Sequence, residues 1–280
     1  MDQIVKIGGS IIQHGKHNNR IYLMKLDPRD SPGIIATMDA LAIQNGYSKI
    51  FAKIFTHDAE PFLNCRYTVE ARVPGSYRGN ELLFLAKYFD NDRKTTPVDQ
   101  LREIKRVIGK NGMYMQETIF LDDRFQFQKL TTEDIVAMAA LYREVFASYP
   151  FPIYESEYLR ETMRANTVYF GIWAQKRLVA LASAEMDIDA GLVEMTDFAV
   201  LPEYRGNGLA LFLLKQMEEE MRLRGIKTAY TIARLQSPGM NLTFSKADYK
   251  YSGTLINNTN ICGNLESMNV WYKKLRDNGM

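Results

Sequence analysis

The segment from Glu194 to Ala210 constrains the fold of this chain most strongly, because an apolar strand runs there through a turn with two glycines into a long helix. Gly206 and Gly208 allow the backbone of the turn to approach a ligand closely. The first N–H groups of a helix have no partner within the helix, and the helix dipole is positive at that end. The pattern therefore predicts a binding site for a phosphate or pyrophosphate group.

The spacing in this turn argues against two common phosphate-binding motifs. A P-loop needs a lysine followed by serine or threonine, and no such pair follows these glycines. A dinucleotide-binding fingerprint needs glycine or alanine at position 211, where this chain has Leu211, and further βα units for which too little chain remains. A turn that only caps the following helix stays an alternative.

Arg205, Gly208 and Ala210 form the pattern Arg-x-x-Gly-x-Ala, which resembles the acetyl-CoA pyrophosphate loop of the GNAT superfamily of N-acetyltransferases. From residue 123 onward the expected order of elements is also similar to that superfamily. The expected strands are 125–130, 168–174, 177–186, one ending at the loop, 227–233, 252–261 and 269–275, and the expected helices are 131–146, 156–166, 208–224 and 237–246. The resemblance implies an α/β (α+β) fold with a catalytic GNAT acetyltransferase domain over residues 123–280.

Residues 1–122 are expected to form a separate amino-terminal α/β half-domain. Residues 42–55 and 221–234 share a helix end, a glycine and a strand, which indicates a degenerate half-copy of the GNAT fold ahead of a complete one. Helix, glycine and strand are a common succession, so chance similarity is the alternative. The first copy has Asp30-Ser-Pro-Gly33 where the second has Arg-x-x-Gly-x-Ala, so we expect no second acetyl-CoA there. Its expected role is to wall the substrate pocket.

Composition limits the partners of the chain. A hydrophobic content of 46% suits a packed core, and a formal net charge of +2 gives no reason to expect nucleic acid or an anionic membrane. There is no signal region and no apolar run of the length that a membrane helix needs, so a cytoplasmic protein is expected. Two cysteines, Cys65 and Cys262, and three scattered histidines predict neither a disulfide framework nor a metal site.

Acetyl transfer to an amine needs a base. An ammonium group with a pKa near 10.4 is protonated at neutral pH, and freeing its lone pair costs roughly 4 to 5 kcal/mol. In the superfamily the strand before the loop often supplies the base, and Glu194 holds the matching place, with Asp197 as second choice. Regular alternation would put Glu194, Thr196, Phe198 and Val200 on one face of the strand, and Met195, Asp197 and Ala199 on the other.

The resemblance also implies a set of residues that bind acetyl-CoA. The backbone of Phe198 and Val200 would bind the acetyl and pantetheine amides, and Asn241 would bond the pantetheine arm. Loop amides would hold the pyrophosphate, from Arg205, Gly206, Asn207, Gly208, Leu209 and Ala210. The usual position of the tyrosine that reprotonates the thiolate falls on Phe244 or Ser245, so Tyr249 is the candidate general acid. A thiolate needs no strong acid.

The last segment of the chain resembles a narrower family, the β-lysine N6-acetyltransferases. The resemblance lies in residues 239–244, 249–255, 257–261 and 266–275. It implies acetylation of the terminal amine of β-lysine to give an osmolyte, with a lysine 2,3-aminomutase as supplier of the substrate. The alternatives are another small-amine acetyltransferase, for polyamines or lysine, and a non-catalytic acyl-CoA sensor. The sequence leaves open whether the protein is a monomer or a homodimer.

Overall fold

The computed structural model describes residues 2–75, 80–95, 120–275 and a few isolated positions between 99 and 109. The chain divides into two compact units. The first consists of Met1–Lys105, Arg234–Gln236 and Ser252–Val270, and the second of Arg106–Ala233, Ser237–Tyr251 and Trp271–Met280. The predicted boundary between residues 122 and 123 stays a prediction, because residues 110–119 just before it lie outside the described part of the chain.

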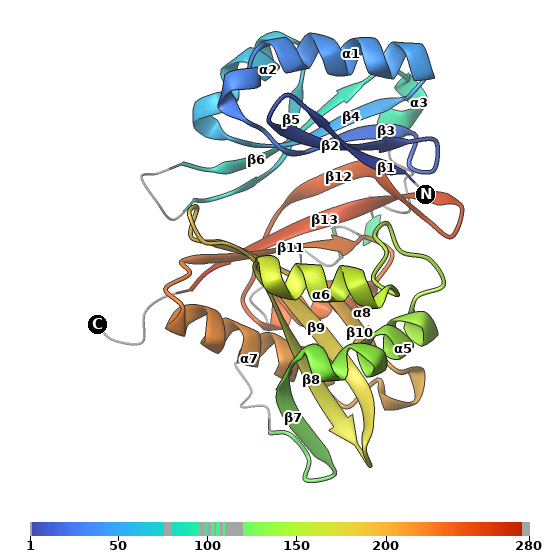
Figure 1. Ribbon diagram of the computed structural model, residues 1–280, viewed down its shortest axis with the longest axis vertical. Coiled ribbons are helices and arrows are strands. Elements are labelled where there is room, and N and C mark those ends of the chain that lie inside the picture. The colour runs from blue at the N-terminus through green and yellow to red at the C-terminus, as the bar shows by residue number, and fades with distance from the viewer. Residues whose placement is uncertain are drawn as a thin grey trace. The chain divides into compact units, whose positions relative to one another are not determined.

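The first unit contains a six-stranded sheet in the order β1-β2-β3-β4-β6-β5. Neighbouring strands are antiparallel except β3 and β4, which are parallel and joined by α1. Helices α1 and α2 lie on one face of this sheet (Figure 1), and their apolar side chains pack with those of the strands into one core. The elements are β1 Gln3–Ile7, β2 Ser10–Gly15, β3 Arg20–Lys25, η1 Pro28–Asp30, α1 Gly33–Asn45, β4 Lys49–Phe55, η2 Thr56–Asp58, α2 Glu60–Asn64, β5 Thr68–Val73, β6 Leu82–Tyr88 and α3 Asn91–Lys94.

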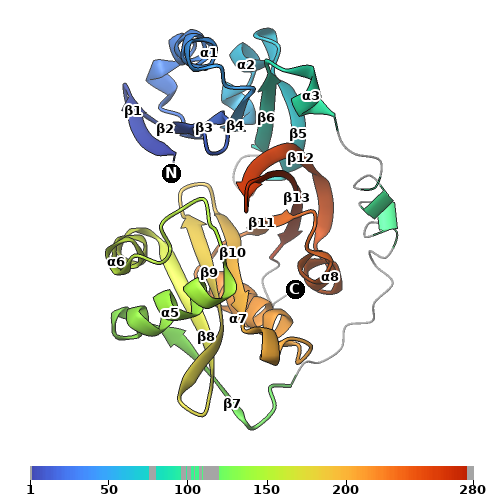
Figure 2. The same ribbon diagram turned by 90° about the vertical axis from the view of Figure 1, so that its right-hand side faces the viewer.

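The second sheet has seven strands in the order β12-β13-β11-β10-β9-β8-β7. In the second unit α7 joins the parallel strands β10 and β11, while β7, β8, β9 and β10 pair antiparallel. Figure 2 shows α5 and α6 on one face of β8, β9 and β10 and α7 on the other, so these strands are covered on both faces. The elements are β7 Phe125–Leu130, η3 Thr132–Asp134, α5 Ile135–Val145, α6 Ser156–Ala165, β8 Thr167–Ala174, β9 Arg177–Asp187, β10 Leu192–Val200, η4 Pro202–Tyr204, α7 Leu209–Leu223, β11 Thr228–Arg234, α8 Pro238–Lys246, β12 Lys250–Ile261 and β13 Asn264–Lys274.

The order of elements from β1 to β6 repeats the order from β8 to β13, while the origin of the first set as a half-copy stays a prediction. From β1 to β6 the chain makes three strands, a helix, a strand, a helix and two strands, as it does from β8 to β13, and each set has the same order within its sheet. The ends of α1 and α7 also agree in detail. Gly46 and Gly225 have φ angles of 62° and 77°, and the residue after each donates its N–H to Ala42 and Met221, respectively. Gly46 and Gly225 are aligned in the comparison of residues 42–55 with 221–234, as are Ala42 and Met221. Both glycines end their helix with the same type of C-cap.

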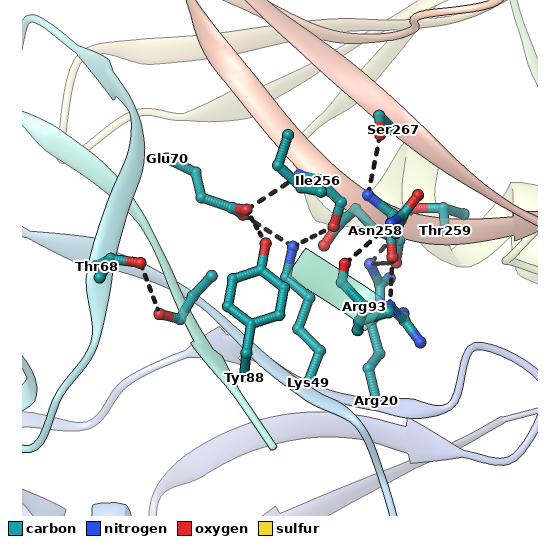
Figure 3. A network of polar contacts seen from close by, with 12 residues as sticks. Arg20, Lys49, Thr68, Glu70, Tyr88, Arg93, Ile256, Asn258, Thr259 and Ser267 are labelled. Atoms are coloured by element: carbon teal, nitrogen blue, oxygen red, sulfur yellow. Dashed lines mark hydrogen bonds and ion pairs between the residues drawn. The ribbon is translucent and has the colours of Figure 1, made fainter. Parts of the chain in front are cut away.

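A buried polar network ties β12 to the first sheet (Figure 3). The side chain of Lys49 on β4 is 0% exposed, and its Nζ donates to Glu70 Oε2 and to the carbonyl of Ile256, both at 2.8 Å. Glu70 in turn accepts from the Ile256 N–H at 3.0 Å and from the Tyr88 hydroxyl. Burial lowers the pKa of Lys49 from 10.5 to about 8. Residues 252–270 therefore supply acceptors for a charge buried in the first unit.

Arg93 adds a second connection of the same kind. Its guanidinium donates to the carbonyls of Asn18 and Asn257 at 2.9 and 2.7 Å and to Ser48 Oγ at 2.9 Å. The side-chain amide of Asn257 donates a hydrogen bond of 2.9 Å to the Arg93 carbonyl.

None of the helices in the described residues has an apolar stretch long enough to cross a membrane.

Candidate active site

Strand β10 carries a bulge at Asp197, and this bulge arranges the site. Thr196 lies opposite Ser183 on β9, but Ala199 lies opposite Leu181, so Asp197 and Phe198 together face a single residue. Asp197 has a φ angle of 54°, a left-handed conformation that aspartate tolerates better than most residues. Such a bulge shifts the alternation of side chains by one position.

The predicted assignment of side chains to faces is therefore wrong beyond Thr196. Residues paired across neighbouring strands lie on the same face of the sheet. Ser183 and Leu181 are two residues apart on β9, so they also share a face. Ala199 thus lies on the face of Glu194 and Thr196, whereas Val200, opposite Ala180, lies on the other. The sequence could not show this, because regular alternation assumes an unbroken ladder.

Glu194 is half-buried in the middle of the sheet. It lies opposite Glu185 on β9 and beside Tyr230 on β11, whose hydroxyl donates to Glu194 Oε2 at 3.0 Å. Glu185 is exposed. A half-buried carboxylate that is oriented by a tyrosine and accessible from one side has the geometry of a general base.

Asp197, the second predicted carboxylate, lies in a cluster of hydroxyl groups. It accepts hydrogen bonds from Ser183 Oγ at 2.6 Å, from Thr196 Oγ1 at 3.3 Å and from the Tyr149 hydroxyl. Burial raises the pKa of Asp197 above its ordinary value, although these hydrogen bonds oppose the rise. Ser183 and Thr196 share the face of Glu194, so the bulge brings both carboxylates to one face of the sheet.

Beyond Glu194, β10 separates from its parallel neighbour. The pairing of β10 with β11 covers Leu192, Val193 and Glu194 and stops there. The backbone of Phe198 and Val200 then borders β9 on one side only, and the Phe198 ring packs edge-on against Phe244 with centroids 5.6 Å apart. An extended ligand that carries amide groups suits this one-sided edge, because it can pair with the strand as another strand would.

The loop after β10 leads to an uncapped helix N-terminus. Gly206 and Gly208 have φ angles of 84° and 73°, and a Cβ added at either would meet no atom of the described residues within 4 Å. The N-cap residue of α7 is Gly208, which has no side chain to cap the helix, and the first turn of α7 contains no acidic residue. The loop therefore presents free backbone N–H groups and open space to an anion, and this arrangement fits the pyrophosphate of acetyl-CoA.

The other predicted loop residues have distinct places. Leu209 is buried in the core and anchors the first turn, Ala210 is half-buried, and the Arg205 side chain donates its Nε to the Val200 carbonyl at 3.3 Å. Asn207 donates to the Tyr204 carbonyl at 2.9 Å and accepts from Arg124 at 2.7 Å. The structure thus brings an additional cation, Arg124, to the loop. Sequence reasoning missed it because it precedes β7, far from the loop in the sequence.

Asn241 and Tyr249 are buried side chains of the second unit. Asn241 is fully buried, donates to the Ser237 carbonyl at 2.8 Å and accepts from Trp271 Nε1 at 3.0 Å. Tyr249 is also fully buried, with its hydroxyl facing Glu218, and burial raises its pKa well above the ordinary value. Both have packing roles here, and their roles on the cofactor stay predictions. The part of the chain that the structure describes holds no group of three or more potential metal ligands.

Comparisons with known proteins agree with this geometry. Residues 133–239 match the acetyltransferase (GNAT) family. The chain is 40% identical to the β-lysine N(6)-acetyltransferase of Methanococcus maripaludis over 98% of this chain and 99% of the relative. It is 33% identical to the N-acetyltransferase YodP of Bacillus subtilis over 95% of this chain and 96% of the relative.

Solved structures agree on the fold. The ribosomal-protein-S5-alanine acetyltransferase from Vibrio fischeri superposes with a TM-score of 0.50 at 12% identity, over 59% of this chain and 100% of that chain. The bulged strand, the loop with two glycines and the uncapped α7 lie within the part of the sequence that matches the family. The chain belongs to the GNAT family of acetyltransferases.

Proposed function

We propose that this enzyme transfers an acetyl group from acetyl-CoA to the terminal amine of β-lysine (3,6-diaminohexanoate), giving N6-acetyl-β-lysine, with Glu194 as general base. The observation that carries the proposal is the half-buried Glu194 carboxylate, placed where β10 leaves β11 and held by Tyr230. The choice of substrate is supported by the 40% identity to an enzyme named for β-lysine.

Different residues bind acetyl-CoA and take the proton from the amine. Acetyl-CoA supplies an acetyl thioester. The uncapped N-terminus of α7, together with Gly206 and Gly208, binds its phosphates, and the free edge of β10 at Phe198 and Val200 aligns its amides. Glu194 takes one proton from the substrate ammonium and so frees the nitrogen lone pair. Without a base, this deprotonation at neutral pH costs roughly 4 to 5 kcal/mol.

Asp197 is the second candidate for the base, and its three hydroxyl donors make it the weaker one. A carboxylate offers about four lone-pair sites, and three of those on Asp197 already accept hydrogen bonds. We assign no general acid. Tyr249 has a fully buried hydroxyl, and a thiol of ordinary pKa near 8.5 leaves as thiolate at neutral pH without strong assistance.

The test measures CoA release by purified protein with β-lysine, α-lysine, ornithine, spermidine and a peptide amine. We expect a preference for β-lysine, and a loss of kcat of about 100-fold or more in Glu194→Gln with the KM for acetyl-CoA unchanged. Glu185→Gln is the matched control, since Glu185 is an exposed carboxylate directly opposite on β9. It should keep kcat within about 2-fold.

Other outcomes would point elsewhere. Preferred turnover of polyamines or α-lysine would keep the acetyltransferase and contradict the β-lysine assignment. Tight binding of acetyl-CoA without turnover of any amine, together with no effect of Glu194→Gln, would support an acyl-CoA sensor. An equal loss of kcat in Glu185→Gln would contradict the role of Glu194.

The proposal also places the reaction in a chemical context. Acetylation removes one positive charge from a substrate with two ammonium groups and one carboxylate, and the product is a net-neutral zwitterion suited to accumulation as an osmolyte. A lysine 2,3-aminomutase would supply the substrate, and we expect the reaction in the cytoplasm by a monomer or homodimer. Supply and role can be checked by following β-lysine and its acetylated product in cells under salt stress.

A further inference from the structure

Asp197 is a half-buried carboxylate without a cation beside it. Its hydrogen-bond donors are the hydroxyls of Tyr149, Ser183 and Thr196, and among the described residues no lysine or arginine forms an ion pair with it. A carboxylate removed from water is costly unless it is paired or fully hydrogen-bonded. Burial raises the pKa of Asp197, and the causes that oppose this rise are its hydrogen bonds with hydroxyl groups.

Four tyrosines from separate elements interact electrostatically with this carboxylate. Tyr142 lies on α5, Tyr149 follows α5, Tyr158 lies on α6 and Tyr169 lies on β8. Burial raises the pKa of each, the charge of Asp197 adds to every one of these shifts, and the Tyr149 hydroxyl donates a hydrogen bond to Asp197.

The hydroxyl of Tyr142 is the second observation that indicates a ligand. Its side chain is 0% exposed, and within the described part of the chain the hydroxyl has no hydrogen-bond partner. A buried polar group without a partner is unusual, because it loses its bonds to water and gains nothing. Tyr149, Tyr158 and Asp197 are only half-buried, so a ligand can approach the cluster from solvent.

The chemistry of the cluster suits one kind of group. An alkylammonium has three N–H donors, no acceptor and one positive charge. The cluster offers a carboxylate, hydroxyl oxygens and aromatic rings, which attract cations through their faces. A phosphate or a carboxylate would instead meet the charge of Asp197 and be repelled.

We propose that Asp197 and the hydroxyls of Tyr142 and Tyr158 bind the second, non-reacting ammonium group of a diamine substrate, while Glu194 serves the amine that is acetylated. This inference rests on the proposed function and specifies the substrate class as diamines. Three residues of extended strand span roughly 10 Å, so the two carboxylates on one face can hold the two ends of one short diamine. Asp197 is then a binding residue, and Glu194 keeps the catalytic role.

The test compares two substrates that differ by one amine. β-Lysine and 6-aminohexanoate share the carbon chain, the carboxylate and the terminal amine, but only β-lysine has the 3-amino group. For Asp197→Asn we expect the KM for β-lysine to rise about 30-fold or more, with the KM for 6-aminohexanoate and the kcat on both within about 3-fold of wild type. Asparagine also tolerates a positive φ, so the bulge is preserved.

Two further variants separate binding from packing. Tyr142→Phe removes a hydroxyl that has no hydrogen-bond partner among the described residues, so a purely structural role predicts equal or higher stability and no kinetic change. We expect instead an increase of about 3-fold in the KM for β-lysine alone. Glu185→Gln, which changes an exposed carboxylate on the same face, should leave the ratio of the two KM values unchanged.

The outcomes distinguish this inference from the proposed function. Equal changes for both substrates in Asp197→Asn, or a fall in kcat with KM unchanged, would overturn the inference and leave the acetyltransferase intact. Acetylation of another diamine would move the same comparison to that diamine and its monoamine. A wild-type enzyme that acetylates no diamine would contradict both the proposed function and the inference.

Discussion

At the scale of single residues, two glycines at opposite ends of α7 allow a matched comparison. Gly208 precedes the helix and Gly225 follows it, with φ angles of 73° and 77°. A Cβ added at either position meets no atom of the chain within 4 Å. The two positions therefore carry the same backbone strain, and only Gly208 borders the loop assigned to the cofactor phosphates.

The change Gly208→Ala should lower both stability and cofactor affinity. We expect each of Gly208→Ala and Gly225→Ala to cost about 1 kcal/mol of unfolding free energy, because alanine is strained at a positive φ. Only Gly208→Ala should raise the KM for acetyl-CoA, by about 10-fold, because its methyl group would take up open space in the loop assigned to the phosphates. Urea denaturation and steady-state kinetics measure the two effects. An equal rise in KM for Gly225→Ala would show that strain alone is responsible.

Asp197 predicts a pH dependence of stability. Burial raises its pKa in the folded state above the ordinary value of 3.8, so the folded protein binds this proton more tightly than the unfolded chain. The corresponding stabilisation is complete below the unfolded pKa and is lost as pH rises through the folded pKa. Asparagine carries no such proton. The stability of wild type relative to Asp197→Asn, measured by urea denaturation, should therefore fall as pH rises above the ordinary pKa of 3.8, and a constant difference would contradict the assignment.

Local motifs indicated part of the candidate site, and only the fold assembled the rest. Glu194 and the loop glycines follow one another along the sequence, so their spacing was informative. Tyr149 and Tyr230 reach the two carboxylates from elements elsewhere in the second unit. The left-handed conformation of Asp197 depends on the register of β10 against β9, which no local pattern contains.

At the scale of elements, the amino-terminal sheet was only half visible in the sequence. The helix end, glycine and strand at 42–55 were predicted, whereas β1, β2 and β3 were missed. Gln13, His14 and Arg20 on β2 and β3 are polar yet buried, so the alternation that marks a strand is lost. His14 forms hydrogen bonds with Gln3 and Tyr47, both at 3.1 Å, and these bonds offset the free-energy cost of burying its ring.

The ion pair between β4 and β5 predicts strong coupling. Lys49 is 0% exposed and Glu70 is 6% exposed, so removal of one partner leaves a charge buried alone. We expect Lys49→Met and Glu70→Gln each to lower the unfolding free energy by about 3 kcal/mol. The double variant should lose clearly less than the sum, because it leaves no unpaired charge.

Urea denaturation of the four proteins in this cycle measures the coupling, and additive losses would contradict it. Glu157→Gln is a surface control, since Glu157 and its partner Arg160 have exposed fractions of 64% and 36%. Its effect should stay below about 0.5 kcal/mol.

At the scale of the whole molecule, the first unit is built from segments distant in sequence. Residues 252–270 belong to it, although they follow most of the second unit along the chain. Composition and motif spacing predict contiguous domains, because they show nothing about which distant segments meet. The interleaving follows instead from buried cations: Arg20 donates to the Asn258 carbonyl, as Lys49 and Arg93 do to those of Ile256 and Asn257.

A fragment of residues 1–122 should therefore fail to fold. Its buried Lys49, Arg20 and Arg93 lack the carbonyl acceptors from residues 256–258, and each unsatisfied charge costs several kcal/mol. We expect no cooperative urea transition for this fragment by circular dichroism. A fusion of residues 1–105 to residues 250–272 through a flexible linker should regain one. A cooperative transition in the fragment alone would contradict the interleaving.

The return of the chain to its first sheet has a consequence for synthesis on the ribosome. Domains that are contiguous in sequence can fold one after another as the chain emerges. Here the amino-terminal sheet emerges first but receives the acceptors for Lys49, Arg20 and Arg93 only after residue 258 has been made. This amino-terminal sheet is thus completed late, and its folding in the cell waits for translation to pass residue 258.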